Sequence, residues 1–196
     1  MNPMDIYLCG VGGQGIGLLA DVLSHACLAA GYRVRGCDTH GLAQRHGTVV
    51  SHLRIGEKLF TPRVSPGNAD LIIGLERLEA MRGALAMLKP GGTVVYYDTV
   101  YQPVFVRLGQ ASYPTAAEFE QAVLARGGRV VRVEMTDLPD PRMQNVALLG
   151  TLGALRAIPG VDGPVIEQAL REGVPARVLE GNLAVYRRAL SQAGNN

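Results

Sequence analysis

The hydrophobic and polar positions of residues 1–140 predict β-strands that alternate with α-helices. Short apolar-rich runs, typical of buried strands, occupy residues 6–9, 32–37, 69–74, 93–97 and 130–133. Between them, residues 16–30 and 75–88 repeat apolar side chains three and four positions apart, which is the spacing of one helix face. Thr115 and Glu118 have the spacing of a capping box and predict a helix that ends at residues 127–128. We therefore expect an α/β fold, Rossmann-like, with a mostly parallel sheet and helices on both faces.

One segment interrupts this alternation. Residues 49–55 alternate polar and apolar positions, which predicts a half-exposed strand, and a Gly-Glu pair at 56–57 separates them from the short run 58–60. The pattern predicts a β-hairpin insertion, or an antiparallel edge, in which residues 58–60 pair with residues 49–55.

The last third of the chain is helical in pattern. Residues 143–158 are apolar nearly all round, so we expect this helix to be buried, either in the core of this chain or against a partner. The run is shorter than the roughly 20 residues of a membrane span and contains Arg156. Two amphipathic segments follow, at 165–170 and 178–190. We expect one domain, 1–196, with an α/β core at 1–140 and a C-terminal helical extension at 141–196.

Composition excludes several classes of function. The net charge of +2 provides no field that would attract nucleic acid or an acidic membrane surface. Cys9, Cys27 and Cys37 show no CxxC spacing, which argues against disulfides, an iron–sulfur cluster or structural zinc in this chain. No secretory signal is visible at the N-terminus. We expect a cytoplasmic protein that binds neither nucleic acid nor membrane.

A glycine-rich turn joins the first strand to the first helix. Gly10, Gly12 and Gly15 fit the GxGxxG spacing of dinucleotide sites, and Asp38 follows at about the distance of a ribose-binding acid. Such a turn leaves unpaired N–H groups and the positive end of a helix at one place, which suits a phosphate or carboxylate. The pattern alone is weakly specific, because the same glycines would also allow tight packing of strand and helix.

The polar segment 38–48 follows the second strand and should lie at the same edge of the sheet as the glycine turn. Three histidines stand six residues apart, at His40, His46 and His52. This spacing does not predict a metal site, and no Ser or Cys nucleophile motif accompanies them, so we expect loop hydrogen bonding, with a catalytic histidine as the alternative. Arg45 and Arg54 are better suited to an anion or a partner carboxylate, although an exposed salt bridge is the commoner role of an Arg.

Three segments together resemble the gamma domain of 2-oxoacid:ferredoxin oxidoreductases. They are the GVGGQGIG turn at 10–17, a Gly-x-x-x-Arg-x-Gly-x-x-x-Ser type of segment seen here at 42–56, and the strand with its sequel at 69–76. The resemblance runs in order through roughly residues 1–150, and the joined motifs are far more specific than GxGxxG. The chain departs from this pattern at His46, where relatives more often have Gly.

The resemblance implies a subunit that carries no cofactor of its own and is inactive alone. Such enzymes oxidatively decarboxylate a 2-oxoacid, here an arylpyruvate such as indolepyruvate, to an acyl-CoA with reduction of ferredoxin. Thiamine diphosphate and 4Fe-4S clusters are expected on a larger alpha subunit, with coenzyme A as co-substrate. We expect no catalytic residue and no metal ligand here; the candidate phosphate or subunit-interface residues are Gly10, Gly12, Gly13, Gln14, Gly15 and Arg45.

Two other classes of function remain open. A stand-alone NAD-dependent dehydrogenase would use the glycine turn and Asp38, but no clear catalytic pair accompanies them. A pure interaction module would have an empty glycine turn and would use the apolar helix at 143–158. An apolar face that awaits a subunit could also pair with a second copy of the chain.

Overall fold

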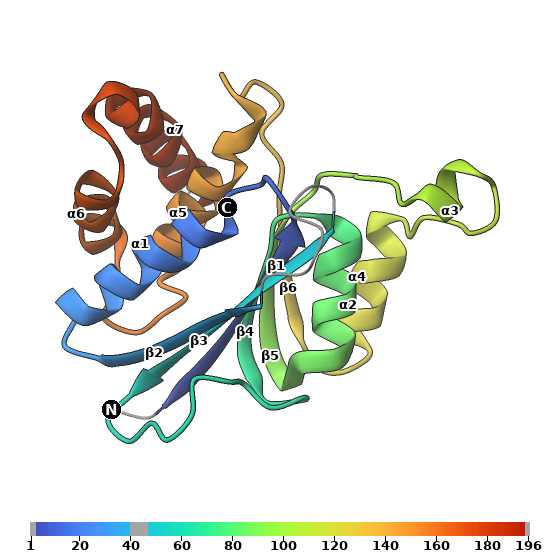
Figure 1. The fold of residues 1–196 in the computed structure, drawn as a ribbon, viewed down its shortest axis with the longest axis horizontal. Coiled ribbons are helices and arrows are strands. Elements are labelled where there is room, and N and C mark those ends of the chain that lie inside the picture. The colour runs from blue at the N-terminus through green and yellow to red at the C-terminus, as the bar shows by residue number, and fades with distance from the viewer. Residues whose placement is uncertain (1–2, 40–46, 195–196) are drawn as a thin grey trace.

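The computed structural model describes residues 3–39 and 47–194 and contains a twisted six-stranded sheet (Figure 1). The strands are β1 Met4–Val11, β2 Arg33–Thr39, β3 Thr48–Gly56, β4 Ala69–Gly74, β5 Leu88–Tyr97 and β6 Arg129–Val133. Their order is β2-β3-β1-β4-β5-β6. Strand β3 pairs antiparallel with both of its neighbours, whereas β1, β4, β5 and β6 are mutually parallel.

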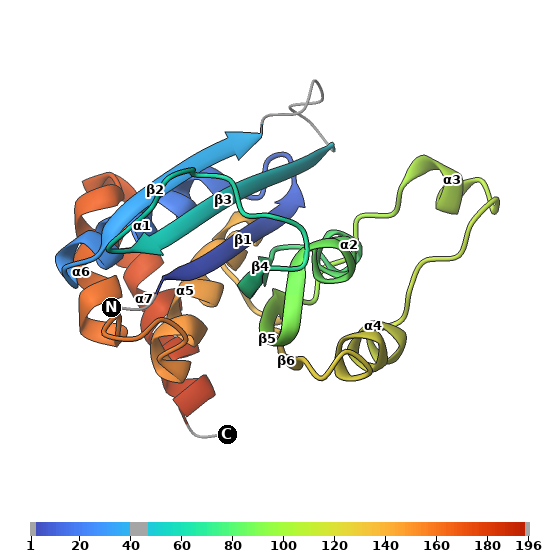
Figure 2. The ribbon, with the colours of Figure 1, turned by 90° about the horizontal axis from the view of Figure 1, so that it is seen from below.

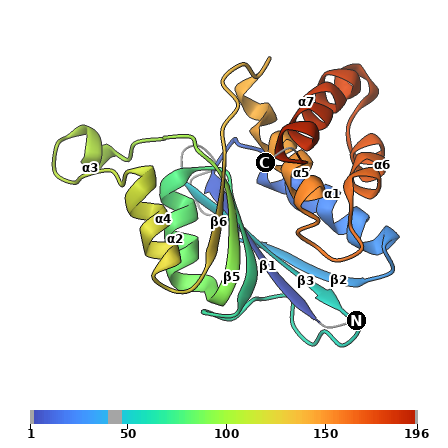
Figure 3. The ribbon, with the colours of Figure 1, turned by 180° about the vertical axis from the view of Figure 1, so that it is seen from behind.

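Helices cover both faces of the sheet (Figures 1 and 3). One face carries α1 Ile16–Ala29, α5 Gln144–Leu155, α6 Gly163–Gly173 and α7 Ala176–Gly194. The other face carries α2 Arg77–Met87 and α4 Ala116–Leu124. The short helix α3, Val104–Arg107, lies on a loop that extends away from both layers (Figures 1 and 2). A 3-10 turn at Pro141–Met143 precedes α5.

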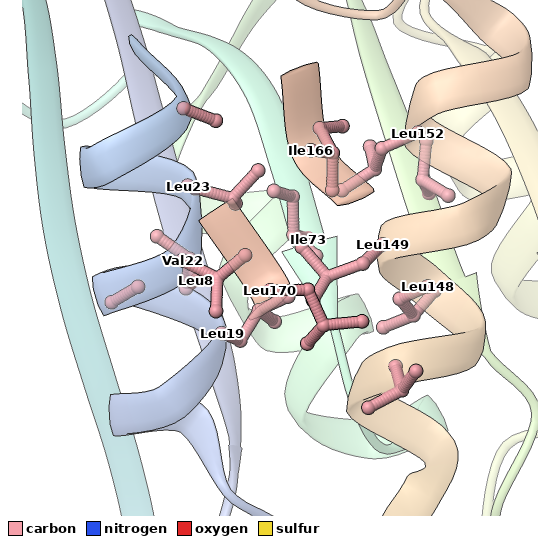
Figure 4. Packing of buried hydrophobic residues seen from close by; sticks show 14 of the residues in the cluster. Leu8, Leu19, Val22, Leu23, Ile73, Leu148, Leu149, Leu152, Ile166 and Leu170 are labelled. Carbon is pink, nitrogen blue, oxygen red and sulfur yellow. The ribbon is translucent and has the colours of Figure 1, made fainter. Parts of the chain in front are cut away.

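The larger core lies between the sheet and the C-terminal helices. Leu8 of β1, Leu19 of α1, Leu149 of α5 and Leu170 of α6 are fully buried there and lie close together (Figure 4). Every residue of 144–153 is buried, so α5 is apolar all round because this chain surrounds it. Of the two expectations for this helix, the structure supports a core helix rather than one covered by a partner.

The predicted fold class is confirmed, but one strand pairing was wrong. The run 58–60 forms no strand, and Phe60 is 92% exposed. Instead β3 pairs with β2 on one side, where Cys37 lies opposite His52, and with β1 on the other. The seven residues of β2 offer far more backbone pairs than a three-residue run, so they compete successfully for the same strand.

Candidate functional site at the carboxyl edge of the sheet

The glycine turn connects the end of β1 to the start of α1, and two of its glycines are sterically required. A Cβ on Gly10 would lie 2.9 Å from Gln14 Oε1 and 3.0 Å from Leu75 Cβ. Gly15 caps α1 in the left-handed region, with φ +80°, and a Cβ there would lie 2.4 Å from Asn145 Nδ2. The turn is therefore packed against the segment that follows β4 and against the start of α5.

Gln14 holds this turn from the inside. Its side chain is buried, its Oε1 accepts from the Val11 amide at 2.7 Å, and its Nε2 donates to the Leu75 carbonyl at 2.6 Å. The same Nε2 lies 3.1 Å from Gln144 Oε1, and Gln144 in turn donates to Thr99 Oγ1 at 3.0 Å. Because both polar atoms of Gln14 bond within the chain, its part in the candidate site is to position the turn.

The first of the C-terminal helices, α5, also holds the glycine turn in place. Asn145, in the first turn of α5, donates from Nδ2 to the Gly15 carbonyl at 3.2 Å, and its Oδ1 accepts from the Val146 amide at 2.8 Å. The shape of a turn in the first fifteen residues therefore depends on a helix that begins at residue 144.

The outer side of the turn is open. Gly13 is exposed, with φ +100°, and none of the described residues lies within 4 Å of an ideal Cβ on it. The Gly12 amide donates to the Gly47 carbonyl at 2.9 Å. Within residues 3–39 and 47–194, the amides of Gly13 and Gly15 have no hydrogen-bond acceptor. Unpaired amides at a helix N-terminus can receive an anion.

A cleft of about 740 Å³ adjoins the turn, large enough for part of a nucleotide-sized molecule. It is lined by Val11, Gly47, Thr48, Glu79, Arg82, Val100, Tyr101, Gln102, Pro103, Val104 and Arg107. The Arg82 guanidinium pairs with Glu79 Oε1 at 2.7 Å, and its side chain is 57% exposed. Arg107 and the Arg82–Glu79 pair are the charged groups that line this cleft.

A buried carboxylate supports the far wall of the cleft. Glu76 is 1% exposed and caps α2 by accepting from the Glu79 amide at 2.8 Å. It also accepts from the Tyr101 amide at 3.2 Å and from the Tyr113 hydroxyl. Burial raises the pKa of the Glu76 carboxyl, while the hydrogen bond from Tyr113 opposes this. No local sequence pattern indicates this role for Glu76, because Tyr101 and Tyr113 lie 25 and 37 residues away.

The other predicted residues divide into three groups. Arg45, His40 and His46 lie outside the described residues. Asp38 is exposed on β2, and β3 separates it from β1 by two strand spacings, roughly 10 Å, which does not favour a dinucleotide ribose site.

Arg54 and His52 have structural partners instead. Of the roles open to Arg54, the structure shows a salt bridge: antiparallel β3 carries this residue to the edge opposite the glycine turn, where it pairs with Asp5 at 2.7 Å. His52 is buried, and its Nδ1 accepts from the Val64 amide at 3.2 Å. Its ring packs edge to face with Tyr7, centroids 5.1 Å apart. Among the described residues, no group of three or more His, Cys, Asp or Glu side chains could hold a metal ion.

The fold and the turn define an α/β protein of the Rossmann-like class. From β1 the chain passes to β2 and β3 on one side of the sheet, and from the adjacent β4 it passes to β5 and β6 on the other side. The turn therefore stands at a topological switch point, where open α/β sheets bind ligands.

Comparison with known proteins then identifies the family. Residues 5–192 match the profile of the pyruvate ferredoxin/flavodoxin oxidoreductase family, and the chain belongs to that family. The indolepyruvate oxidoreductase subunit IorB of Thermococcus kodakarensis is 34% identical over 95% of this chain and 94% of its own length. The subunit of the same name from Pyrococcus horikoshii is 32% identical over the same shares of both chains. The predicted family is confirmed.

Solved structures share the fold. The gamma subunit of a keto/oxoacid ferredoxin oxidoreductase from Geobacter sulfurreducens superposes with a TM-score of 0.68 at 18% identity, covering 98% of this chain and 99% of that one. A 2-oxoglutarate:ferredoxin oxidoreductase from Magnetococcus marinus superposes with a TM-score of 0.75 at 20% identity, covering this whole chain and 32% of the longer one. Among the described residues, no helix is both long and apolar enough to span a bilayer.

Proposed function

We propose that this chain is the smaller subunit of a 2-oxoacid:ferredoxin oxidoreductase whose substrate is an arylpyruvate such as indolepyruvate. The observation that carries the proposal is the match, over nearly the full length of both chains, to two relatives named as indolepyruvate oxidoreductase subunits. The complex would convert the 2-oxoacid and coenzyme A to carbon dioxide and an acyl-CoA and would pass two electrons to ferredoxin. The chain alone would be inactive.

We further propose that thiamine diphosphate and the 4Fe-4S clusters belong to the larger subunit. Cluster ligation requires thiolates, and two of the three cysteines here are buried. Burial raises the pKa of Cys27 to about 12, and burial followed by the nearby Glu79 and Glu76 carboxylates raises the pKa of Cys9. These thiols suit packing rather than cluster ligation, and free cysteines fit a reducing cytoplasm.

The glycine turn would hold an anionic group of coenzyme A. Three features support this role: the Gly13 and Gly15 amides at the start of α1, for which the described residues provide no acceptor, the exposed position of Gly13, and the adjoining cleft with Arg82. The fold-related enzyme from Magnetococcus marinus was solved with coenzyme A bound. In this proposal Gln14 keeps the amides in place and makes no contact with the ligand.

A matched pair of variants tests the phosphate role in the assembled complex. Gly13→Ala and Gly13→Asp face the same backbone strain at φ +100°, and only Asp adds a negative charge. Repulsion of a phosphate should raise the KM for coenzyme A at least about tenfold in Gly13→Asp relative to Gly13→Ala, with the KM for the 2-oxoacid unchanged. Equal KM values for coenzyme A in the two variants would reject a phosphate site at this turn.

The subunit role is tested in the native host. Purification of this chain should bring with it a larger protein that contains thiamine diphosphate and iron–sulfur clusters. Ferredoxin reduction by arylpyruvate and coenzyme A should require both proteins. If the chain purifies without a partner and the purified chain binds NAD, it would instead be a stand-alone dehydrogenase.

A further inference from the structure

Residues 101–113, which we call the arm, extend from the body of the molecule between β5 and α4 (Figures 1 and 2). Helix α3 lies within the arm, and none of its residues is buried. Three apolar side chains are largely exposed there: Val104 at 51%, Phe105 at 61% and Leu108 at 63%. A one-turn helix does not form stably by itself in water, and a group of exposed apolar side chains marks an interaction surface.

The base of the arm is fixed to the body. Tyr101 at one end and Tyr113 at the other both donate hydrogen bonds to the buried Glu76 carboxylate. Next to them, Arg77 donates to the Pro114 carbonyl at 3.2 Å, and its guanidinium lies 5.9 Å from the centre of the Tyr113 ring. A loop that is closed at its base loses less conformational entropy when its tip is bound.

The arm also forms one wall of the cleft beside the glycine turn. Tyr101, Val104 and Arg107 line this cleft together with Val11 at the end of β1. A protein that contacts the arm would therefore also cover the candidate site. The proposed reaction needs the cofactors of the larger subunit near that site. The larger subunit is therefore the expected binding partner of the arm.

The charge of the arm indicates the chemistry of the partner surface that would bind it. Arg107 is the single charged residue of the arm, and the cleft that it lines also contains Arg82, which is paired with Glu79. The matching surface is thus an apolar groove with carboxylate groups at its rim. A second copy of this chain fits less well, because a two-fold contact between arms would bring the two Arg107 side chains toward each other.

We propose that the arm inserts α3 into an apolar, carboxylate-rimmed groove of the larger subunit of the oxidoreductase, and thereby closes the cleft over the glycine turn. This inference rests on the proposed function, because it takes the larger subunit as the partner. Phe105 and Leu108 are the anchors, and Arg107 provides the orienting charge.

The test titrates the full chain against the separately purified larger subunit of the oxidoreductase from the same organism. The test variants are Phe105→Asp and Leu108→Asp. The control is Phe60→Asp, since Phe60 is also exposed but follows β3 at the opposite edge of the sheet. Each test variant should raise the Kd at least about 30-fold, as expected for an anchor residue, while the control stays within about twofold of the parent chain. Because Phe105, Leu108 and Phe60 are each more than 60% exposed, all three variants should keep the parent Tm.

The outcomes separate this inference from the proposed function. If the parent chain binds the larger subunit and the arm variants bind equally well, the arm inference is overturned and the proposed function stands. If the parent chain does not bind the larger subunit at all, both are overturned. If the arm variants instead abolish a homodimer that persists in the presence of the larger subunit, a second copy occupies the arm and the inference is also wrong.

Discussion

Replacement of Gln14 by Leu removes a buried amide while roughly keeping its volume. The Val11 amide and the Leu75 carbonyl, bonded to Gln14 at 2.7 and 2.6 Å, are then left without partners in a buried region. Each unsatisfied backbone group costs about 1–3 kcal/mol, and the added apolar burial recovers about 1 kcal/mol. We expect Gln14→Leu to lower the free energy of unfolding by about 3 kcal/mol, which corresponds to about 6–12 °C in Tm for a chain of this size.

The measurement is urea unfolding of the parent and variant chains, followed by circular dichroism. Gln121→Leu on the exposed face of α4 is the control and should change the free energy of unfolding by less than about 0.5 kcal/mol. A double-mutant cycle with Gln144→Leu should show a coupling of about 1 kcal/mol, because the two amides share a bond of 3.1 Å. If Gln14→Leu is no more destabilising than the control, the buried hydrogen bonds of Gln14 do not hold the turn.

Two further predictions concern the same edge of the sheet and the buried histidine. Gly15→Ala should lower the free energy of unfolding by about 2–4 kcal/mol, because left-handed backbone strain adds to the clash with Asn145. The control Gly160→Ala, at φ +74° with no described residue within 4 Å of the added Cβ, should lower it by only about 1 kcal/mol. Equal losses of stability in urea unfolding would disprove the clash. Burial, and secondarily Arg63, lower the pKa of His52, so the unfolded chain binds a proton at this imidazole more readily than the folded chain does. The neutral His52 therefore contributes its full stability above the unfolded pKa near 6.5, and this contribution is lost as the pH falls. His52→Asn, which keeps an acceptor for the Val64 amide, should flatten the decline in stability from about pH 7 to about pH 5, and an unchanged slope would contradict the assignment.

Local signals in the sequence predicted local structure well. The periodicity of residues 16–30 corresponds to α1, and the run at 69–74 coincides with β4. Thr115 and Glu118 form the predicted capping box, with the Thr115 amide donating to Glu118 Oε2 at 2.7 Å. These features depend on residues a few positions apart, so a sequence pattern carries nearly all the information that determines them.

Features that depend on distant residues could not be predicted in the same way. The partner of β3 is decided by competition between strands, and the turn glutamine finds partners 61 and 130 residues further along the chain. The partner of Arg54 likewise depends on the strand pairing, because antiparallel β3 brings this residue to Asp5 at the edge opposite the turn. Gln14 was correctly placed at the turn, but no pattern around it shows that its side chain points inward.

The apolar surfaces show the same limit of prediction from local sequence patterns. They also indicate where a partner subunit is expected to bind. A helix covered by its own chain and a helix covered by another subunit need the same side chains, so the all-round apolar residues 143–158 did not separate the two cases. In the structure α5 is enclosed by its own chain, which removes it as a docking surface. The arm remains, with Phe105 and Leu108 exposed over a base fixed by Glu76. Because the carboxyl ends of β1 and β5 lie at one edge of the sheet, a single partner surface can contact the arm and face the glycine turn together.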